Sequence, residues 1–337
     1  MERAPALDID DLSSLTSYLR RGGWIAAGER PRARILPGGV SNKTVLVERD
    51  GEAWVLKQAL AKLRVPVDWF SDPIRIHREA SALRWFEELA PGAAPKLVFE
   101  DRDEHVLCME AVPEPHENWK DKLLDGRVDR DDVRQFGALL GDVHRRSAAR
   151  LDALEPEFGD RSFFESLRIE PYYLYTAERV PAAAPFLLAL VDETRPIAAA
   201  LTHGDFSPKN VLVYQGRPKL LDYEVAHIGD PAFDLGFSLA HLLSKARHLP
   251  RVRNELLASV DLYWTAYREA VADAPFVDGL EERAVRHACA CLLARARGRS
   301  QLEYLSDEAK DRQAADVVRM LPGPPTISEL AAEFSAA

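Results

Sequence analysis

Four oxygen-bearing side chains flank a predicted β-hairpin. Val211 to Tyr214 and Pro218 to Leu221 are short apolar runs typical of strands, and Gly216 lies in the turn between them. Two of the four side chains precede the first strand and two follow the second, so the hairpin is expected to bring all four to the same end. The set consists of Asp205, Asn210, Asp222 and Glu224.

These residue types suit a magnesium-dependent reaction. Carboxylate and amide oxygens are the ligands that Mg²⁺ prefers, so Asn210, Asp222 and Glu224 are predicted metal ligands. A further carboxylate nearby, Asp205, can accept the proton of a hydroxyl group. Phosphoryl transfer needs such a metal site, cations along the phosphates and an acceptor held in line. The stretch is therefore interpreted as the catalytic centre of a phosphotransferase, with ATP and Mg²⁺ as cofactors.

A lysine and a glutamate in the N-terminal part of the chain supply the cation that this chemistry requires. Lys57 lies in a predicted strand, Ala53 to Gln58, and Glu79 lies beside the apolar stripe of a predicted helix, Asp72 to Leu89. A helix packed on the small sheet would place Glu79 against Lys57, which would then be held where it can bind nucleotide phosphates. Glu79 as an ordinary exposed helix residue is an equally good interpretation of the local pattern.

A glycine-containing loop precedes that strand. Glycines between two strands allow backbone N–H groups to approach phosphate oxygens closely, although paired glycines also make simple turns. A second contact is expected where the two parts of the chain join, since Glu110 and Val112 can offer backbone groups to an adenine edge. The predicted loop contacts to the nucleotide are Gly38, Gly39, Ser41 and Asn42.

The pattern of elements divides the chain into three parts. A helical segment, 1–29, precedes a β-rich nucleotide-binding part, 30–112, and the remainder, 113–337, is mainly helical and carries the catalytic loop and the substrate site. Two of its stretches, Arg161 to Arg179 and Pro185 to Ala200, are expected to be helical, with breaks at Pro171 and Pro181.

Composition and net charge indicate which classes of binding partner to expect. The chain has 337 residues, of which 47% are hydrophobic and 29% charged, as in a soluble globular protein. A net charge of −10 argues weakly against nucleic acid or an anionic membrane surface as the main partner. It fits solubility as well as a cationic substrate, and a bulk charge does not choose between these two. No apolar run approaches the ~20 residues that span a bilayer, and no signal pattern begins the chain, so a cytoplasmic protein is expected.

Several spaced motifs together resemble one known family. They are His203-Gly204-Asp205, Asn210, Asp222-Tyr223-Glu224, Asp230-Pro231 and Asp234-Leu235-Gly236. The segment is similar to the aminoglycoside phosphotransferase and choline kinase family, whose fold is like that of protein kinases. The resemblance implies a two-lobed α+β fold, with a small β-rich N-lobe carrying one packed helix and a larger helical C-lobe. It also implies that Asp205 is the catalytic base and that Asn210 and Asp222 bind the metal, while His203 and Asp234 are interpreted as structural.

A narrower resemblance connects the chain to methylthioribose kinases. It is carried by Lys57-Gln58-Ala59-Leu60, Arg64, Trp69, Arg75, Glu79-Ala80 and the Asp-x-Glu of Asp222 and Glu224. The adjacent C-terminal arginines that grip the sugar in those kinases have no match, because Arg295, Arg297 and Arg299 are separated by one residue each.

The main hypothesis is an ATP-dependent kinase that transfers the γ-phosphoryl group to a hydroxyl of a sugar, aminoglycoside or amino-alcohol-like substrate. A nucleotide-binding module without catalysis is one alternative. A metal-dependent hydrolase is another, since His203, Asp205 and Asp222 are also potential metal ligands.

Overall fold

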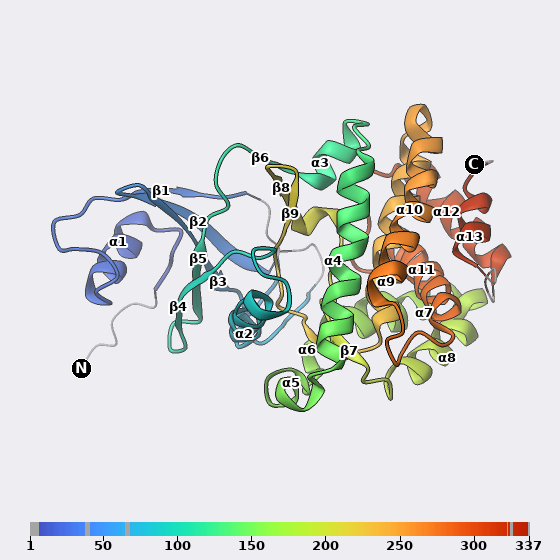
Figure 1. The fold of residues 1–337 in the computed structure, drawn as a ribbon, viewed down its shortest axis with the longest axis horizontal. Coiled ribbons are helices and arrows are strands. Elements are labelled where there is room, and N and C mark those ends of the chain that lie inside the picture. The colour runs from blue at the N-terminus through green and yellow to red at the C-terminus, as the bar shows by residue number, and fades with distance from the viewer. Residues whose placement is uncertain (1–6, 38–40, 65–67, 322, 324–325, 336–337) are drawn as a thin grey trace.

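A small β-rich lobe and a larger helical lobe make up the chain, as the sequence predicts (Figure 1). The computed structural model describes residues 7–37, 41–64, 68–321, 323 and 326–335. The proposed division after residue 112 lies in a stretch without secondary structure that follows the last strand of the sheet.

The N-terminal lobe is a five-stranded antiparallel sheet with the strand order β1-β2-β3-β5-β4. Asp50 and Gly51 form the turn between β2 and β3, and Gly51 has a φ of 84°. This turn aligns Lys57 with Thr44 on the neighbouring strand. The elements of the lobe are α1 (Leu12–Arg21), β1 (Arg32–Ile35), β2 (Asn42–Arg49), β3 (Glu52–Ala59), α2 (Arg75–Leu89), β4 (Leu97–Asp101) and β5 (Val106–Glu110).

Helix α1 belongs to the core of this lobe. Leu15 and Leu19 share a buried cluster with Val45, Val47 and other residues of the sheet. Burial of such side chains contributes about 1.5–3 kcal/mol each. The helical segment before the sheet therefore covers the sheet and is not a free extension.

Helix α2 joins the two lobes. Its buried residues Ile76, Leu83 and Phe86 belong to the same hydrophobic cluster as the core of the helical lobe. Phe86 lies with its ring centroid 4.5 Å from that of Tyr223, which comes from the segment after the catalytic hairpin. A helix packed in this way holds the N-terminal site residues in register with the C-terminal ones.

The C-terminal lobe is organised around long packed helices and two small sheets. Its strands are β6 (His116–Asn118), β7 (Ala200–Thr202), β8 (Val211–Tyr214), β9 (Arg217–Leu220) and β10 (His227–Gly229). Its longer helices are α4 (Arg130–Ala148), α8 (Ala184–Thr194), α9 (Pro231–His248), α10 (Arg253–Val271), α11 (Leu280–Arg297) and α12 (Asp307–Met320). Its shorter helical elements are α3 (Trp119–Leu124), α5 (Leu151–Phe158), α6 (Ser162–Phe164), η1 (Glu165–Leu174), α7 (Tyr175–Arg179), η2 (Pro181–Ala183), η3 (Pro208–Asn210), η4 (Pro250–Val252) and α13 (Ile327–Glu333).

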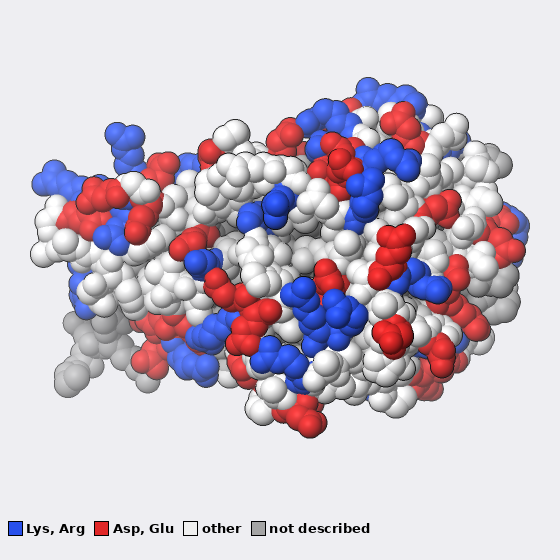
Figure 2. Space-filling model, in the orientation of Figure 1, with Lys and Arg blue, Asp and Glu red and all other residues white. Residues whose placement is uncertain are grey.

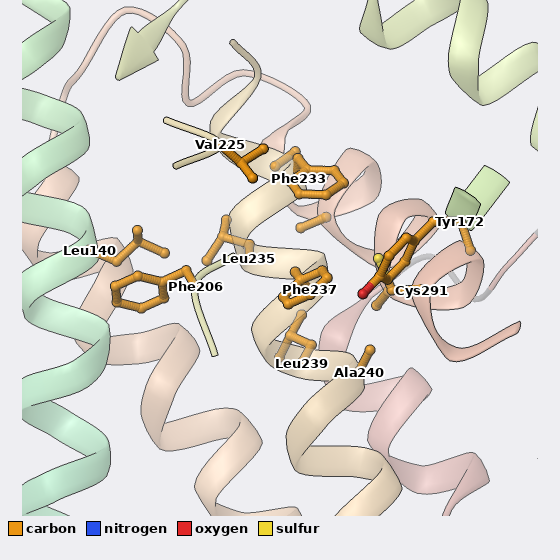
Figure 3. Close-up of a cluster of buried hydrophobic side chains, with 14 of the residues drawn as sticks. Leu140, Tyr172, Phe206, Val225, Phe233, Leu235, Phe237, Leu239, Ala240 and Cys291 are labelled. Carbon is orange, nitrogen blue, oxygen red and sulfur yellow. The ribbon is translucent and has the colours of Figure 1, made fainter. Parts of the chain in front are cut away.

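Helix α9 lies at the centre of this lobe and is buried along almost its whole length. Figure 3 shows its Phe233, Phe237 and Leu239 in a hydrophobic cluster with Tyr172 and Leu140. Gly236 allows α11 to approach closely, because a Cβ at this position would lie 2.6 Å from the backbone nitrogen of Ala288. The first residues of α9 therefore have a tightly defined position.

The predicted break at Pro171 is wrong. Residues Glu165–Leu174 form a π-helix, η1, that continues from α6 into α7. Pro171 has no N–H to donate, and the wider π-helical turn accommodates it inside the element. The predicted break at Pro181 is present, and the chain turns by 115° between the two helical segments, Ser162–Arg179 and Pro181–Thr194. The π-helix carries Arg168 and Tyr172 toward the catalytic loop.

Charges of both signs are interspersed on the face of the molecule seen in Figure 2. Among the described residues, no single helix is long and apolar enough to cross a membrane, and one bent pair, Ser162–Arg179 with Pro181–Thr194, meets the length and composition criteria together.

Candidate active site

The predicted hairpin is present and brings the flanking residues together. Strands β8 and β9 pair antiparallel, and Gln215 and Gly216 form the turn with positive φ values of 49° and 68°. Beyond the last strand pair, the backbone N–H of Leu221 donates to the carbonyl of Asn210 at 2.9 Å. This bond places Asn210 and Asp222 at the same end of the hairpin.

Asp234, in the first turn of α9, holds the backbone of the predicted catalytic loop, residues 203–210 between β7 and β8. Its carboxylate accepts hydrogen bonds from the N–H groups of His203 at 2.6 Å and Gly204 at 2.8 Å. Gly204 has a φ of 75°, and a Cβ there would lie 2.8 Å from the carbonyl oxygen of Val225. His203 completes the scaffold, since its Nδ1 accepts from the N–H of Asp205 at 3.1 Å. His203 and Asp234 thus have the structural contacts that the sequence predicts.

Asp205 is held by two neighbours and keeps one carboxylate oxygen available. Its Oδ2 accepts from Asn210 Nδ2 at 2.9 Å and lies 3.3 Å from Arg168 Nη2. Arg168 is itself buried and donates from Nε to the carbonyl of Gly204 at 2.6 Å. No described residue donates a hydrogen bond to Oδ1 of Asp205. A substrate hydroxyl can therefore reach this carboxylate without displacing a protein contact.

Lys57 and Glu79 meet as predicted, and Asp222 joins them. Lys57 Nζ lies 2.7 Å from Glu79 Oε1 and 3.0 Å from Asp222 Oδ1. Glu79 is fully shielded from solvent, so the alternative of an exposed helix residue is excluded. One ammonium thus connects β3, α2 and the segment after β9.

Burial and charge act against each other in this triad. Burial disfavours a charged Lys57, but the carboxylates of Asp222 and Glu79 outweigh it and raise the pKa of the ammonium. Burial also disfavours ionised Asp222, yet the charge of Lys57 holds the pKa of this carboxyl well below its usual value. Lys57 is consequently a permanent cation and Asp222 a permanent anion at neutral pH.

Glu224 is held by an arginine. Its Oε2 lies 3.0 Å from Arg75 Nε and accepts from Asn42 Nδ2 at 3.2 Å. Arg75 is fully buried and also donates to the carbonyl oxygens of Ser41 and Leu60. A buried network therefore joins Ser41, Asn42 and Glu224 at the end of the predicted nucleotide loop.

The remaining predicted nucleotide contacts lie at the loop and at the connection between the lobes. Gly38 and Gly39 lie outside the described residues. The N–H of Glu110 is already used, since it donates to the carbonyl of Lys96 at 2.8 Å. The N–H of Val112 makes no hydrogen bond to a described residue, so it is the better donor for a ligand.

The oxygen set at the end of the hairpin fits a hard cation. Asn210 Oδ1 and Asp222 Oδ2 accept no hydrogen bond from a described residue. Neither atom is among the buried polar atoms that lack a partner, so both remain accessible to a cation. Amide and carboxylate oxygens of this kind are magnesium ligands. Within the described chain there is no cluster of three or more His, Cys, Asp or Glu residues arranged around a metal position. The fit thus depends on Asn210 and Asp222, with Glu224 committed through one oxygen to Arg75.

Two arginines that contact site residues, Arg168 and Arg75, were not assigned a role from the sequence. Arg168 contacts Asp205, and Arg75 contacts Glu224, but both arginines lie far from these partners in the chain. Nothing in the local pattern around Arg168 indicates its contact, whereas Arg75 was part of the narrower resemblance. His227 and Asp230 are structural, since His227 stacks on Phe164 and Asp230 caps α9.

Comparison with known proteins agrees with this geometry. Residues 32–272 match the phosphotransferase enzyme family. The chain belongs to this family. The match covers the sheet, the Lys57–Glu79 pair and the whole catalytic segment, so the family resemblance inferred from the motifs is confirmed.

Relatives of this phosphotransferase-family protein include methylthioribose kinases. The enzyme of Klebsiella pneumoniae is 24% identical over 253 aligned positions, and the match covers 64% of this chain and 62% of the relative. That of Yersinia enterocolitica is 25% identical over 251 aligned positions, and the match covers 63% of this chain and 62% of the relative. The chain thus spans less than two thirds of the length of these relatives.

Solved structures share the fold. The amicoumacin kinase in complex with AMP-PNP, Ca²⁺ and its ligand has a TM-score of 0.61 and 12% identity, over 95% of this chain and 97% of that one. The choline kinase of Cryptosporidium parvum has a TM-score of 0.57 and 12% identity, over 92% and 95%. The two-lobed kinase-like fold expected for the family member is confirmed.

Proposed function

We propose that this protein is an ATP-dependent kinase that transfers the γ-phosphoryl group to a hydroxyl of a small molecule. The observation that carries the proposal is the position of Lys57 Nζ, which lies 2.7 Å from Glu79 Oε1 and 3.0 Å from Asp222 Oδ1. It joins a cation suited to phosphates with a metal-binding carboxylate, beside the available oxygen of Asp205.

The nucleotide lies between the lobes in this proposal. Lys57 binds its phosphates, and Glu79 keeps the ammonium in place. The loop that ends in Ser41 and Asn42 covers the phosphates, with Gly38 and Gly39 as further proposed contacts. The backbone of Glu110 and Val112 faces the adenine edge.

Asn210 and Asp222 would hold Mg²⁺, whose charge compensates that of the phosphates during transfer. Asn210 also orients Asp205 through its amide group. Glu224 has one oxygen paired with Arg75, and its other oxygen is proposed as a further ligand or a partner of a metal-bound water. These roles require the two strands of the hairpin, β8 and β9, to stay in register, because Asn210 precedes one strand and Asp222 follows the other.

Asp205 accepts the proton of the acceptor hydroxyl. Arg168 and Asn210 occupy Oδ2 of its carboxylate and so direct Oδ1 toward the acceptor. General-base catalysis of this kind contributes about 10²–10⁴ in rate. Sugars, aminoglycosides and amino alcohols are the acceptor classes to test first, because methylthioribose kinases and choline kinases are among the similar proteins.

The deciding experiment measures ADP release from Mg·ATP in the presence of such a panel. Acceptor-stimulated ADP release supports the kinase. ATP binding in a thermal-shift titration without turnover of any acceptor would favour the silent nucleotide-binding module. Activity without nucleotide, together with a tightly bound transition metal, would favour the hydrolase.

A further inference from the structure

Buried basic and phenolic side chains lie along α9 beyond the catalytic loop, and none of the roles above uses them. Lys245 is fully shielded from solvent, and His241 and Arg295 are 4% and 8% exposed. Tyr304 lies beside them, with its ring centroid 5.2 Å from Lys245 Nζ. We call this group the α9 basic cluster; its members are His241, Lys245, Arg295 and Tyr304.

The cluster continues directly from the catalytic base. The guanidinium of Arg295 lies 5.1 and 5.3 Å from the ring centroids of Tyr172 and Phe237, two residues seen in Figure 3. The guanidinium of Arg168 lies against the same two rings, at 5.5 and 5.6 Å. Because Arg168 contacts Asp205, a row of basic side chains leads from the base to Arg295, and Arg295 Nη2 lies 3.1 Å from His241 Nε2.

The catalytic loop runs along the same helix. Ser238 Oγ donates to the carbonyl of Phe206 at 2.7 Å, one turn beyond the contacts of Asp234 with the loop. His241 and Lys245 follow on successive turns of α9. The cluster therefore lies within the helical lobe, and the side chains of Arg168, Tyr172 and Phe237 connect it to Asp205.

The positive charges of the cluster form no ion pair within the described chain, and the carboxylates of Glu303 and Asp121 act on Lys245 only from a longer range. No described carboxylate forms an ion pair with Lys245 or Arg295. The nearby Glu303 pairs with Lys120, and Glu170 pairs with Arg299. Buried charges are normally paired, because an isolated charge loses its hydration without compensation.

Three hydrogen-bonding atoms of the cluster are also unused. Lys245 Nζ, Arg295 Nε and Tyr304 Oη are buried and have no hydrogen-bond partner among the described residues. All three can donate, so the same ligand atom type, an anionic oxygen, would satisfy them. Burial, with Lys120 and Arg295 nearby, lowers the pKa of Lys245 to about 7, which an anion would reverse.

We propose that the α9 basic cluster binds an anionic oxygen group, a carboxylate or a phosphate, of the acceptor whose hydroxyl is phosphorylated at Asp205. This inference rests on the proposed kinase function and narrows its acceptor to hydroxyl compounds that carry a negative charge. An anionic acceptor differs from the cationic substrate that the net charge of −10 would suit, because the α9 basic cluster is locally positive.

Anion binding is tested first without turnover. The full chain is titrated with inorganic phosphate and with malonate in a thermal-shift assay, against sodium chloride at equal ionic strength, with and without Mg·AMP-PNP. We expect a rise in Tm with both oxyanions and at least tenfold weaker binding in K245M. K96M, which removes a lysine that is 62% exposed, is the matched control and keeps the response.

The unliganded variant gives an independent result. Lys245→Met removes a buried charge that lacks a counter-ion, so we expect the free K245M protein to melt at a higher temperature than wild type. A lower Tm of the free variant, or equal phosphate binding by K245M and wild type, would overturn the proposal.

Acceptor charge is then tested on one carbon skeleton. ADP release is measured with glucose, glucosamine, gluconate and glucose 6-phosphate at equal ionic strength. We expect kcat/KM to be at least tenfold higher for the two anions than for the others, and K245M to abolish this preference. Gluconate and glucose 6-phosphate separate a carboxylate from a phosphate ligand.

The two proposals fail in different ways. Turnover of glucose or glucosamine that K245M leaves unchanged refutes the anionic acceptor and keeps the kinase. No ADP release with any acceptor, together with Lys245-dependent phosphate binding, refutes the kinase and keeps the anion site.

Discussion

Arg75 and Glu224 are 149 residues apart in the chain, yet Nε of the arginine lies 3.0 Å from Oε2 of the glutamate in the protein interior. The same guanidinium donates to the carbonyl oxygens of Ser41, Leu60, Ser71 and Asp72. One side chain thus holds the end of the proposed nucleotide loop, the start of α2 and the segment after the β8–β9 hairpin. Loss of this contact should affect both stability and nucleotide binding.

Arg75→Met should lower the free energy of unfolding by about 3–5 kcal/mol, because it leaves Glu224 as a buried carboxylate without its cation. Chemical denaturation measures the loss. Arg102→Met is the matched control, since Arg102 is 71% exposed and its ion pair should contribute about 0–1 kcal/mol. Equal losses of unfolding free energy in the two variants would show that the buried Arg75–Glu224 pair stabilises the protein no more than an exposed ion pair.

Asp205→Asn should reduce kcat by about 10²–10⁴ while leaving the affinity for ATP unchanged, because the amide cannot accept the hydroxyl proton. Single-turnover kinetics and a nucleotide titration measure the two effects separately. Full turnover in this variant would refute the assignment of Asp205 as base.

Asp234→Asn should lower stability by about 1.5–3 kcal/mol, because charge-assisted hydrogen bonds to the N–H groups of His203 and Gly204 are lost. The loop carrying Asp205 should also be displaced, so kcat should fall although Asp234 does not reach the substrate. Denaturation and kcat are measured on the same preparation. A stable variant with unchanged kcat would contradict the scaffold role.

Stability should fall as the pH is lowered from about 6.5 to about 4. Burial lowers the pKa of His227 and of His287 to about 4. In this window the unfolded chain binds a proton at each imidazole while the folded chain does not, so acid favours unfolding. Each histidine contributes about 1.4 kcal/mol per pH unit. Denaturant titrations over this range measure the slope, which should decrease by one proton in His227→Asn; an unchanged slope would exclude His227 as a source.

The sequence predicted those parts of the site that depend on short-range spacing. The hairpin between Asn210 and Asp222 follows from two apolar runs and a turn, and the Lys57–Glu79 pair follows from a helix packed on a sheet. Arg168 could not be assigned, because its contact with Asp205 depends on a π-helix that absorbs Pro171. Local pattern predicts the ordinary helical period and a break at proline, whereas tertiary packing decides otherwise here.

Helix α9 has a consequence for how such a protein diversifies. Asp234, in its first turn, sets the backbone of the catalytic loop, and Lys245 lies about 16 Å further along the helix axis. Since one helix carries both residues, substitutions in its distal turns would change the proposed anion site while the contacts of Asp234 with the loop are retained. Libraries that vary positions 241 and 245 together with 295 are therefore the rational starting point for redirecting this kinase-like scaffold to new substrates.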